Sequence, residues 1–170
     1  MDTSADAMML TGRLADGDRT GPLEFCPIQR ALETIGTRSA LVLLREAFWG
    51  TRRFEDFARR AGITEQIAAT RLKQLVDAGV LSKQPYKTPG QRTRYEYVLT
   101  GQGRQLYPVL VSLIEFGLHL QGDARQLDLV HGEDCGAAIT THVQCAEGHT
   151  VPLARTQARM RPRRKRRAAD

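Results

Sequence analysis

Apolar residues recur at helical spacing from the first third of the chain onward. Ile28, Leu32 and Ile35 stand at positions i, i+4 and i+7, which places them on one face of a helix. Pro27 suits a first helical position and Gly36 suits a C-terminal stop. The pattern predicts a first helix bounded by these two residues.

The next two segments predict two more helices. A second helix is expected from a cap at Ser39 to Gly50, and it is apolar on most sides, as is typical of a core helix. Residues 52–62 predict a third, shorter helix whose two phenylalanines turn inward. Arg59 and Arg60 are expected near its end, pointing outward.

A fourth helix is predicted after a tight joint at the preceding glycine. Thr64 can cap this helix through its hydroxyl, and Gly79 ends it. Ala68, Leu72 and Leu75 share one apolar face. At about 100° per residue the opposite face carries polar and small side chains: Gln66, Ala69, Thr70, Lys73 and Asp77.

Two strands and a long helix are predicted next. Residues 80–86 and the alternating residues 94–99 predict strands, with a turn at Pro89 and Gly90 between them. The tip of this hairpin carries polar and cationic residues: Lys87, Gln91, Arg92 and Arg94. Thr100 can cap a final helix over about residues 101–121, whose apolar stripe is long for the domain it covers.

The predicted fold class is a winged helix-turn-helix, mainly α with a small β-hairpin wing and a small C-terminal extension. We expect a flexible leader over residues 1–22 and a DNA-binding and dimerisation domain over residues 23–121. A small Cys/His-containing extension is expected over residues 122–153, and a disordered basic tail over residues 154–170.

Charge is distributed unevenly along the 170 residues, whose net charge is +6. Residues 50–104 carry a net charge of +6 and residues 154–170 a net charge of +7, whereas residues 1–49 carry −2 and residues 105–153 carry −5. Two separated basic blocks favour a polyanionic partner over a purely solubilising role.

The polar face of the fourth helix and the basic hairpin together predict a surface for double-stranded DNA. The major groove of B-DNA, about 12 Å wide, admits one helix, and cations beside it can contact phosphates. The predicted DNA-binding residues are Arg52, Arg53, Thr64, Gln66, Ala69, Thr70, Arg71, Lys73, Lys87, Gln91, Arg92 and Arg94. An ordinary solvated face and a winged-helix protein-interaction adaptor are the alternatives, and the basic hairpin favours DNA.

Four segments resemble the HxlR-type winged-helix regulators: CPIQRALETIG, ALVLLREAFWGTRRF, ITEQIAATRLKQLVDAGVL and RYEYVLTGQGRQLYPVL. The resemblance covers about Cys26 to Leu120; Thr37-Arg38-Ser39 stands where the family usually has a tryptophan. It implies a homodimeric transcriptional regulator, expected to be a repressor, that binds a pseudo-palindromic operator. The first and last helices would form the dimer interface.

Cysteine and histidine residues suggest two further sites. In some members of that family the cysteine matching Cys26 senses oxidants, and a thiolate at a helix N-terminus is stabilised; a buried, inert thiol is the alternative. The spacing H-x3-C-x9-C-x3-H suits zinc, with His131, Cys135, Cys145 and His149 as ligands. A β-rich appendage from AITTHVQCA and HTVPLA is the alternative to zinc.

Zinc is the one cofactor that the residues suggest. A zinc- or redox-responsive regulator, with a small-molecule or oxidant effector, therefore stays open. The chain lacks a G-x-S-x-G nucleophile elbow and a P-loop, so we expect no enzyme. It also lacks a secretory signal and an apolar run of about 18 residues, so we expect a cytoplasmic protein without a membrane partner.

Overall fold

The computed structural model describes residues 7–17, 26–87, 90, 92–122 and 127–160. The chain divides into two compact units. We call residues 24–141 the helical unit, and residues 1–23 together with 142–170 the terminal unit. Within the described ranges, no helix is long and apolar enough to cross a membrane.

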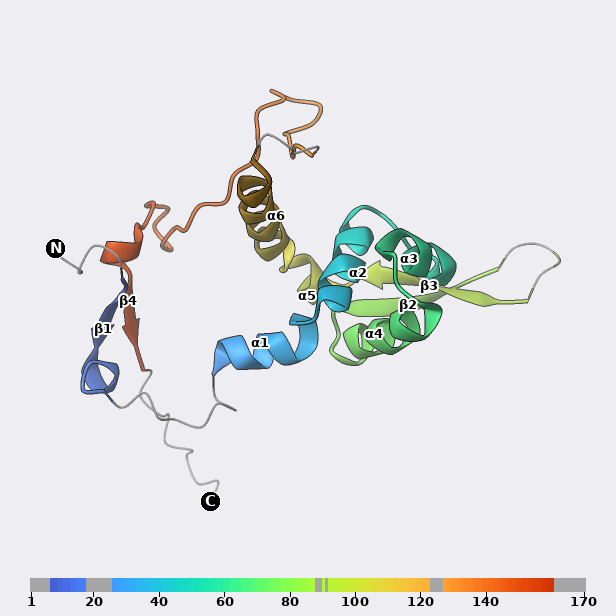
Figure 1. Ribbon diagram of the computed structural model, residues 1–170, viewed down its shortest axis with the longest axis horizontal. Coiled ribbons are helices and arrows are strands. Elements are labelled where there is room, and N and C mark those ends of the chain that lie inside the picture. The colour runs from blue at the N-terminus through green and yellow to red at the C-terminus, as the bar shows by residue number, and fades with distance from the viewer. Residues whose placement is uncertain (1–6, 18–25, 88–89, 91, 123–126, 161–170) are drawn as a thin grey trace, which may run out of the picture. The chain divides into compact units, whose positions relative to one another are not determined.

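The helical unit is mainly α-helical with one antiparallel hairpin (Figure 1), which confirms the predicted fold class. Its elements are α1 (Pro27–Ile35), α2 (Arg38–Phe48), α3 (Phe54–Ala61), α4 (Glu65–Asp77), β2 (Leu81–Tyr86), β3 (Arg94–Leu99), α5 (Gly101–Arg104) and α6 (Tyr107–Gln121). The order matches the one that the apolar periodicity predicts, apart from the division of the last helix.

The core forms where α2, α3 and α4 pack against the base of the hairpin. Its buried side chains are Leu43, Leu44, Phe57, Leu72, Leu75, Val80, Leu81 and Tyr97. The rings of Phe57 and Tyr97 meet edge to face with centroids 6.0 Å apart. Each large side chain buried here contributes about 1.5–3 kcal/mol, so this cluster fixes α4 relative to the hairpin.

The helix caps are formed by threonines. Thr64 accepts a hydrogen bond from the Ile67 amide at 3.3 Å, as predicted. At α2 the predicted cap is wrong, because Thr37 rather than Ser39 accepts from the Ala40 amide, at 3.2 Å. Ser39 already lies inside the helix, since a capping hydroxyl must stand two or three residues before the amide that it accepts from.

The predicted final helix is two helices rather than one. Thr100 caps α5 by accepting from the Gly103 amide at 3.0 Å, but α5 ends at Arg104 and α6 begins at Tyr107. Pro108 lacks an amide hydrogen and cannot donate to the Arg104 carbonyl, so a continuous helix would lose a hydrogen bond here. A proline is tolerated in the first turn of a helix, and α6 restarts with Pro108 in that turn.

The hairpin is extended by the segment before α3. Strands β2 and β3 pair from Leu81 with Leu99 to Tyr86 with Arg94. The Tyr97 amide donates to the Arg52 carbonyl at 2.8 Å, and Arg53 bridges Glu96. The hairpin projects past the ends of α3 and α4 (Figure 1), which makes it the wing of a winged helix.

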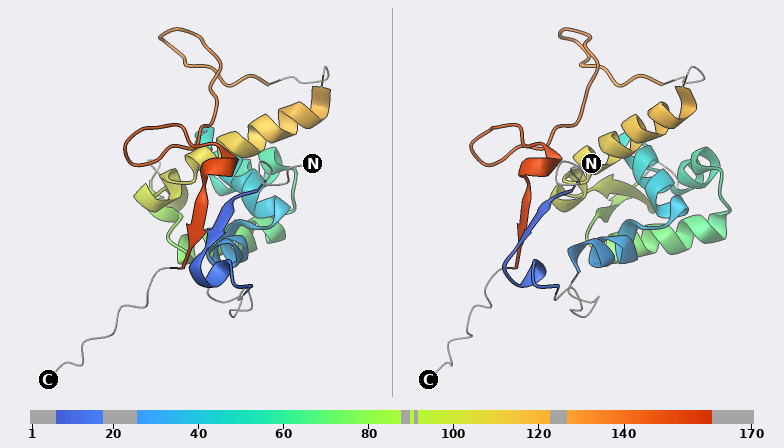
Figure 2. Two further views of the ribbon diagram at one scale, coloured as in Figure 1. Left: turned by 90° about the vertical axis from the view of Figure 1, so that its left-hand side faces the viewer. Right: turned by 60° about the vertical axis from the view of Figure 1, so that its left-hand side comes forward.

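The terminal unit joins two segments far apart in sequence. Strand β1 (Met9–Thr11) pairs in parallel with β4 (Gln157–Arg159), and the two lie side by side in Figures 1 and 2. Short 3-10 turns adjoin them at Gly12–Leu14 and Leu153–Arg155. The predictions of a flexible leader and a disordered tail are therefore wrong at these strands. No local pattern predicts a pairing across almost the whole chain. Residues 1–6 and 161–170 lie outside the described residues.

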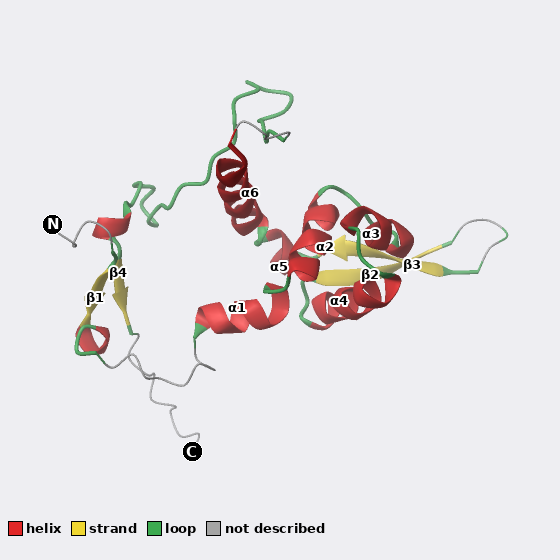
Figure 3. Cartoon of the chain, viewed as in Figure 1, coloured by secondary structure: helices red, strands yellow, loops and turns green. Residues whose placement is uncertain are grey.

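Residues 127–152 form neither helix nor strand (Figure 3). Two turns stand out in this segment, one closed by a bridge between Val130 and Ala138 and one by a bridge between Gln144 and Thr150. The alternative predicted for this segment is a β-rich appendage with two strands. Within these described residues the structure has two isolated β-bridges and no strand. The division between the units falls between the two turns. The domain boundaries drawn from the sequence otherwise stay predictions.

Candidate DNA-binding surface

A tight joint sets α4 against α3. Gly62 has φ of 62° and ψ of 39°, a left-handed conformation that favours glycine, and Thr64 then caps α4. The Ile63 amide donates to the Ala58 carbonyl at 3.2 Å, which closes the end of α3. The joint therefore satisfies its own backbone groups while turning the chain sharply.

Helix α4 has one buried face and one open face. Ala68, Leu72 and Leu75 are fully buried in the core. The predicted contact residues on the other side, Gln66, Ala69, Thr70 and Lys73, are all exposed. The orientation matches the one predicted from the helical spacing. It leaves an amide, a hydroxyl and an ammonium group open to a partner.

Three of the predicted contact side chains on α4 already have partners within the helix. The Thr70 hydroxyl donates to the Gln66 carbonyl at 2.9 Å. Lys73 Nζ lies 2.5 Å from a carboxylate oxygen of Asp77. The half-buried Arg71 donates to the Gln74 side chain at 2.7 Å. Thr70 therefore offers its methyl group and its acceptor lone pairs, and Asp77 offsets the charge of Lys73.

The start of α3 holds two of the predicted cations beside the wing. Arg52 Nη1 lies 3.4 Å from Glu96 Oε1 on β3. The Arg53 guanidinium lies over the Tyr86 ring, 5.3 Å from its centroid. Both side chains remain exposed. Contacts on the hairpin thus bring these two residues, adjacent in sequence, to the wing side of the helical unit.

The wing itself carries exposed cations. Lys87, Arg92 and Arg94 are exposed, and Gln91 lies outside the described residues. Two residues that the sequence analysis missed join them: Lys83, whose ammonium lies 5.5 Å from the Tyr97 ring centroid, and Tyr95, which is 57% exposed. Strand alternation does not single out Tyr95, because residues 95 and 97 are two apart and face the same side of β3; Tyr95 is exposed although Tyr97 is buried.

Arg59 and Arg60 lie at the end of α3 and are exposed, as predicted, although both side chains have partners within the helical unit. Arg60 donates to the hydroxyl of the buried Thr51 at 3.1 Å, and that hydroxyl donates to the buried Glu46 carboxylate at 3.3 Å. Arg45 also pairs with Glu46, at 2.6 Å. A buried carboxylate needs such partners, so Arg60 is turned toward the joint between α2 and α3. Arg59 pairs with Asp56 on its own helix.

The predicted metal ligands lie in two pairs. In the helical unit Cys135 Sγ lies 3.7 Å from His131 Nδ1, and in the terminal unit Cys145 Sγ lies 3.7 Å from His149 Nδ1. Within the described part of the chain, no group of three or more His, Cys, Asp or Glu side chains is arranged to hold a metal ion. Each pair by itself supplies two candidate ligands.

Cys26 stands at the N-cap position of α1 and is half-buried. Its side chain does not cap the helix, and its thiol is not in a disulfide. Both the oxidant-sensing and the inert interpretations fit this position, so the role of Cys26 stays a prediction.

A family model for HxlR-like helix-turn-helix proteins matches residues 34–124, which include α2 to α6 and the wing. The chain belongs to this family. The resemblance drawn from the sequence is thereby confirmed. The relatives that match are named as HTH-type transcriptional regulators, which agrees with the prediction that the chain is no enzyme.

Three proteins illustrate the similarity. The uncharacterized HTH-type transcriptional regulator Rv3095 of Mycobacterium tuberculosis is 39% identical over 104 residues, which cover 61% of this chain and 65% of the relative. The chain thus spans just under two thirds of that relative's length. PA1607, assigned as a transcription factor, superposes with a TM-score of 0.70 at 29% identity over 85% of this chain and 98% of its own. The redox regulator HypR, in its reduced form, superposes with a TM-score of 0.50 at 27% identity over 58% of this chain and 95% of its own.

Proposed function

We propose that this HxlR-like chain is a homodimeric DNA-binding transcriptional regulator that reads a pseudo-palindromic operator. The observation that carries the proposal is the open polar face of α4, held by a buried face on the core and flanked by the cationic wing. A helix with this geometry can enter a major groove while the wing lies along the flanking backbone. Repression is the expected sign of regulation, as the family resemblance implies.

The residues divide into two roles. Gln66, Ala69 and Thr70 stand near the N-terminal half of α4 and face outward, where a recognition helix meets base edges. Cations on the wing and before α3 contact phosphates: Arg52, Arg53, Lys87, Arg92 and Arg94. Phosphate contacts supply affinity that does not depend on sequence, and base contacts supply specificity.

The dimer is supported by apolar side chains that the helical unit leaves exposed. On α6 the exposed residues Val109, Leu113, Phe116 and Leu120 recur at spacings of three or four and form one stripe. Phe116 is 62% exposed and Leu120 is 70% exposed. On α1, Ile28 and Leu32 are also exposed. A second copy of the chain would cover these faces, as the resemblance implies for the first and last helices.

The dimer is tested by placing a charge in the stripe. Phe116→Glu is expected to give a monomer in sedimentation velocity and to lose operator binding. Gln121→Glu adds the same charge at an exposed position on α6 outside the stripe and is the matched control. If the Phe116→Glu protein stays dimeric, the exposed stripe on α6 is not part of the dimer interface.

Footprinting of the DNA upstream of the protein's own gene tests DNA binding directly. A protected site is expected to contain two half-sites about 34–36 Å apart, one helical turn of DNA, or a multiple of that spacing. Thr70→Ala is expected to narrow the ratio of operator affinity to random-DNA affinity, because it removes a group on the reading face. A protein that ignores duplex DNA at low salt would refute the proposal.

A zinc-holding variant of the same regulator is the second candidate, favoured by the two Cys–His pairs. Ideal tetrahedral zinc places thiolate sulfur and imidazole nitrogen about 3.6 Å apart, given bonds of about 2.3 Å and 2.0–2.1 Å. Both pairs have 3.7 Å between these atoms, so each pair taken by itself has a spacing that suits two of the four zinc ligands. We propose that the four residues picked out by the spacing, His131, Cys135, Cys145 and His149, are the zinc ligands, with each Cys–His pair supplying two of them.

Elemental analysis of the purified chain tests this candidate. One zinc ion per chain is expected, and Cys135→Ser and Cys145→Ser should each lose it. Cys26→Ser is the matched control and should retain the metal. Protein that lacks stoichiometric zinc after purification without chelators, and that takes none up on titration, would remove this candidate.

A further inference from the structure

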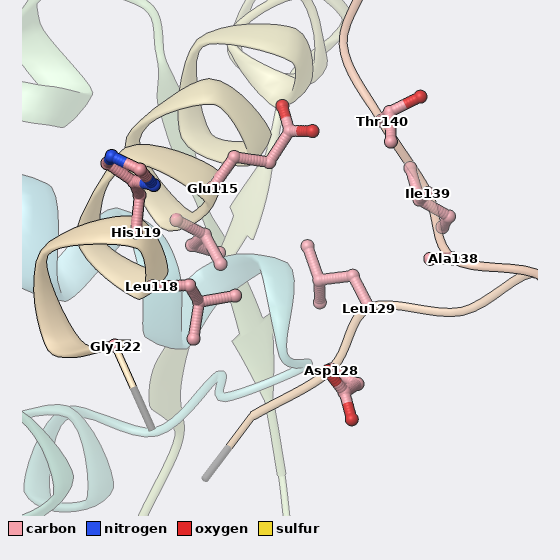
Figure 4. Close-up of a pocket in the computed structure, with 10 residues that line it drawn as sticks. Glu115, Leu118, His119, Gly122, Asp128, Leu129, Ala138, Ile139 and Thr140 are labelled. Carbon is pink, nitrogen blue, oxygen red and sulfur yellow. The ribbon is translucent and has the colours of Figure 1, made fainter. Parts of the chain in front are cut away.

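The helical unit contains an open cavity of about 670 Å³ behind the C-terminal half of α6. It is lined on one side by Ile114, Glu115, Leu118, His119 and Gly122, and on the other by Asp128, Leu129, Ala138, Ile139 and Thr140. Figure 4 shows Leu118 and Leu129 on opposite sides of the space, with Glu115 toward one end and Asp128 toward the other. Cavities that bind small molecules have about 300–1,000 Å³.

The cavity lies on the face of α6 opposite the exposed stripe. At about 100° per residue, Ile114 stands about 120° and Leu118 about 160° from Leu120 around the helix axis. The N-terminal half of α6 covers the core through the buried Val111. Beyond that residue, the inward side of the helix faces residues 128–140 instead. The cavity therefore lies beside the part of α6 that extends beyond the core.

One hydrogen-bonded contact holds the wall opposite α6 in place. The Thr141 amide donates to both carboxylate oxygens of Glu115, at 3.1 and 3.3 Å, and the Thr141 hydroxyl donates to the same group. This contact uses the Glu115 carboxylate at the rim. The Asp128 carboxylate is exposed and is not the acceptor in that contact, so it is available to a ligand.

The lining has the chemistry of a site for an apolar cation. Four aliphatic side chains, Ile114, Leu118, Leu129 and Ile139, supply apolar walls. Two carboxylates supply negative charge, and none of the lining residues that the structure describes is a lysine or arginine. The Asp128 carboxylate is exposed, so it supplies negative charge at one end of the cavity, while the aliphatic walls supply contacts for the apolar body of a ligand.

We propose that this cavity binds a small organic cation with an aromatic or aliphatic body, and that this ligand is an effector of DNA binding. The apolar body lies between Leu118 and Leu129, and the cationic group meets the Asp128 carboxylate. The ligand would contact the face of α6 opposite the dimer stripe, so its binding would be linked to the dimer and to operator affinity. The effector role rests on the proposed function, whereas the binding site does not.

Three probes with one apolar body separate charge from hydrophobicity: 1-naphthylmethylamine, which is a cation at pH 7, the neutral 1-naphthylmethanol and the anion 1-naphthoate. Their binding to the full chain is measured by isothermal titration calorimetry. The amine is expected to bind about tenfold tighter than the alcohol, and the naphthoate more weakly than both. Equal affinity for the three probes, or no binding of the amine, would overturn the proposal.

Two variants place the binding in this cavity. Asp128→Asn is expected to remove most of the preference for the amine and to leave the affinity for the alcohol unchanged. Glu133→Gln removes a nearby exposed carboxylate outside the lining and is the matched control. Leu129→Trp fills the cavity and should weaken all three probes. Amine binding that Asp128→Asn and Leu129→Trp both leave unchanged would place the ligand elsewhere and overturn the proposal.

Operator affinity with and without the amine tests the effector role. A shift of about threefold or more, absent in Asp128→Asn, supports it, and an unshifted affinity with the amine bound overturns it. Failure of the proposed function would be distinguishable, because the ligand-free protein would then fail to bind the operator while calorimetry still detected the amine.

Discussion

The salt dependence of DNA binding gives the sharpest test of the wing. Arg94 ends β3, pairs in register with Tyr86 and is exposed, and its guanidinium has no ion pair recorded within the described residues. Replacing Arg94 by alanine removes a cation from the wing without opening the core. Substitution of such an exposed residue should change the free energy of unfolding by no more than about 0.5 kcal/mol.

The magnitude follows from counterion release. Each phosphate that a protein neutralises contributes about 0.9 to the slope of log affinity against log salt concentration. The proposed dimer would carry two copies of Arg94, so the slope should become shallower by about 1.8 in Arg94→Ala. Over a fourfold range from about 50 to 200 mM salt, wild-type affinity should then fall about 12-fold more than the affinity of the variant.

Fluorescence anisotropy with labelled operator and random duplexes at several salt concentrations measures both slopes. The effect should be similar on the two duplexes, because phosphates carry no sequence information. Arg30→Ala removes an exposed arginine from α1, at the opposite side of the helical unit from the wing (Figure 1), and is the matched control. An unchanged slope in Arg94→Ala, or a loss confined to the operator, would refute the role given to the wing.

Three further outcomes follow from the structure. Asp77→Asn should tighten DNA binding and steepen the salt slope by about 0.9 for each chain, because Lys73 loses the carboxylate that offsets its charge; an unchanged slope would place Lys73 away from phosphates. Gly103→Ala should lower the free energy of unfolding by about 1–3 kcal/mol, since the added Cβ would lie 2.1 Å from the Val80 carbonyl oxygen. Gly117→Ala meets nothing within 4 Å in the middle of α6 and should instead raise it by about 0.5–1 kcal/mol. Chemical denaturation of the two glycine variants and the wild type would measure both changes in the free energy of unfolding. Equal changes in the two variants would contradict the close packing around Gly103.

The sequence by itself determined the elements whose signals are local. The spacing of Ala68, Leu72 and Leu75 fixed which side of α4 is buried, and the position of Thr64 fixed where α4 begins. Periodicity and caps act within one or two helical turns, so they can be read from a single segment. The break before α6 is also local, and Pro108 is its signal in the sequence.

Tertiary structure decided what depends on residues far apart in the chain. The pairing of β1 with β4, the turn of Arg60 toward Thr51 and the docking of Arg52 and its neighbour on the hairpin all join distant or differently patterned segments. The cavity behind α6 likewise exists only because residues 128–141 fold back onto that helix. Such contacts depend on packing and on the pairing of buried polar groups, and no short-range pattern in the sequence encodes which distant partner satisfies them.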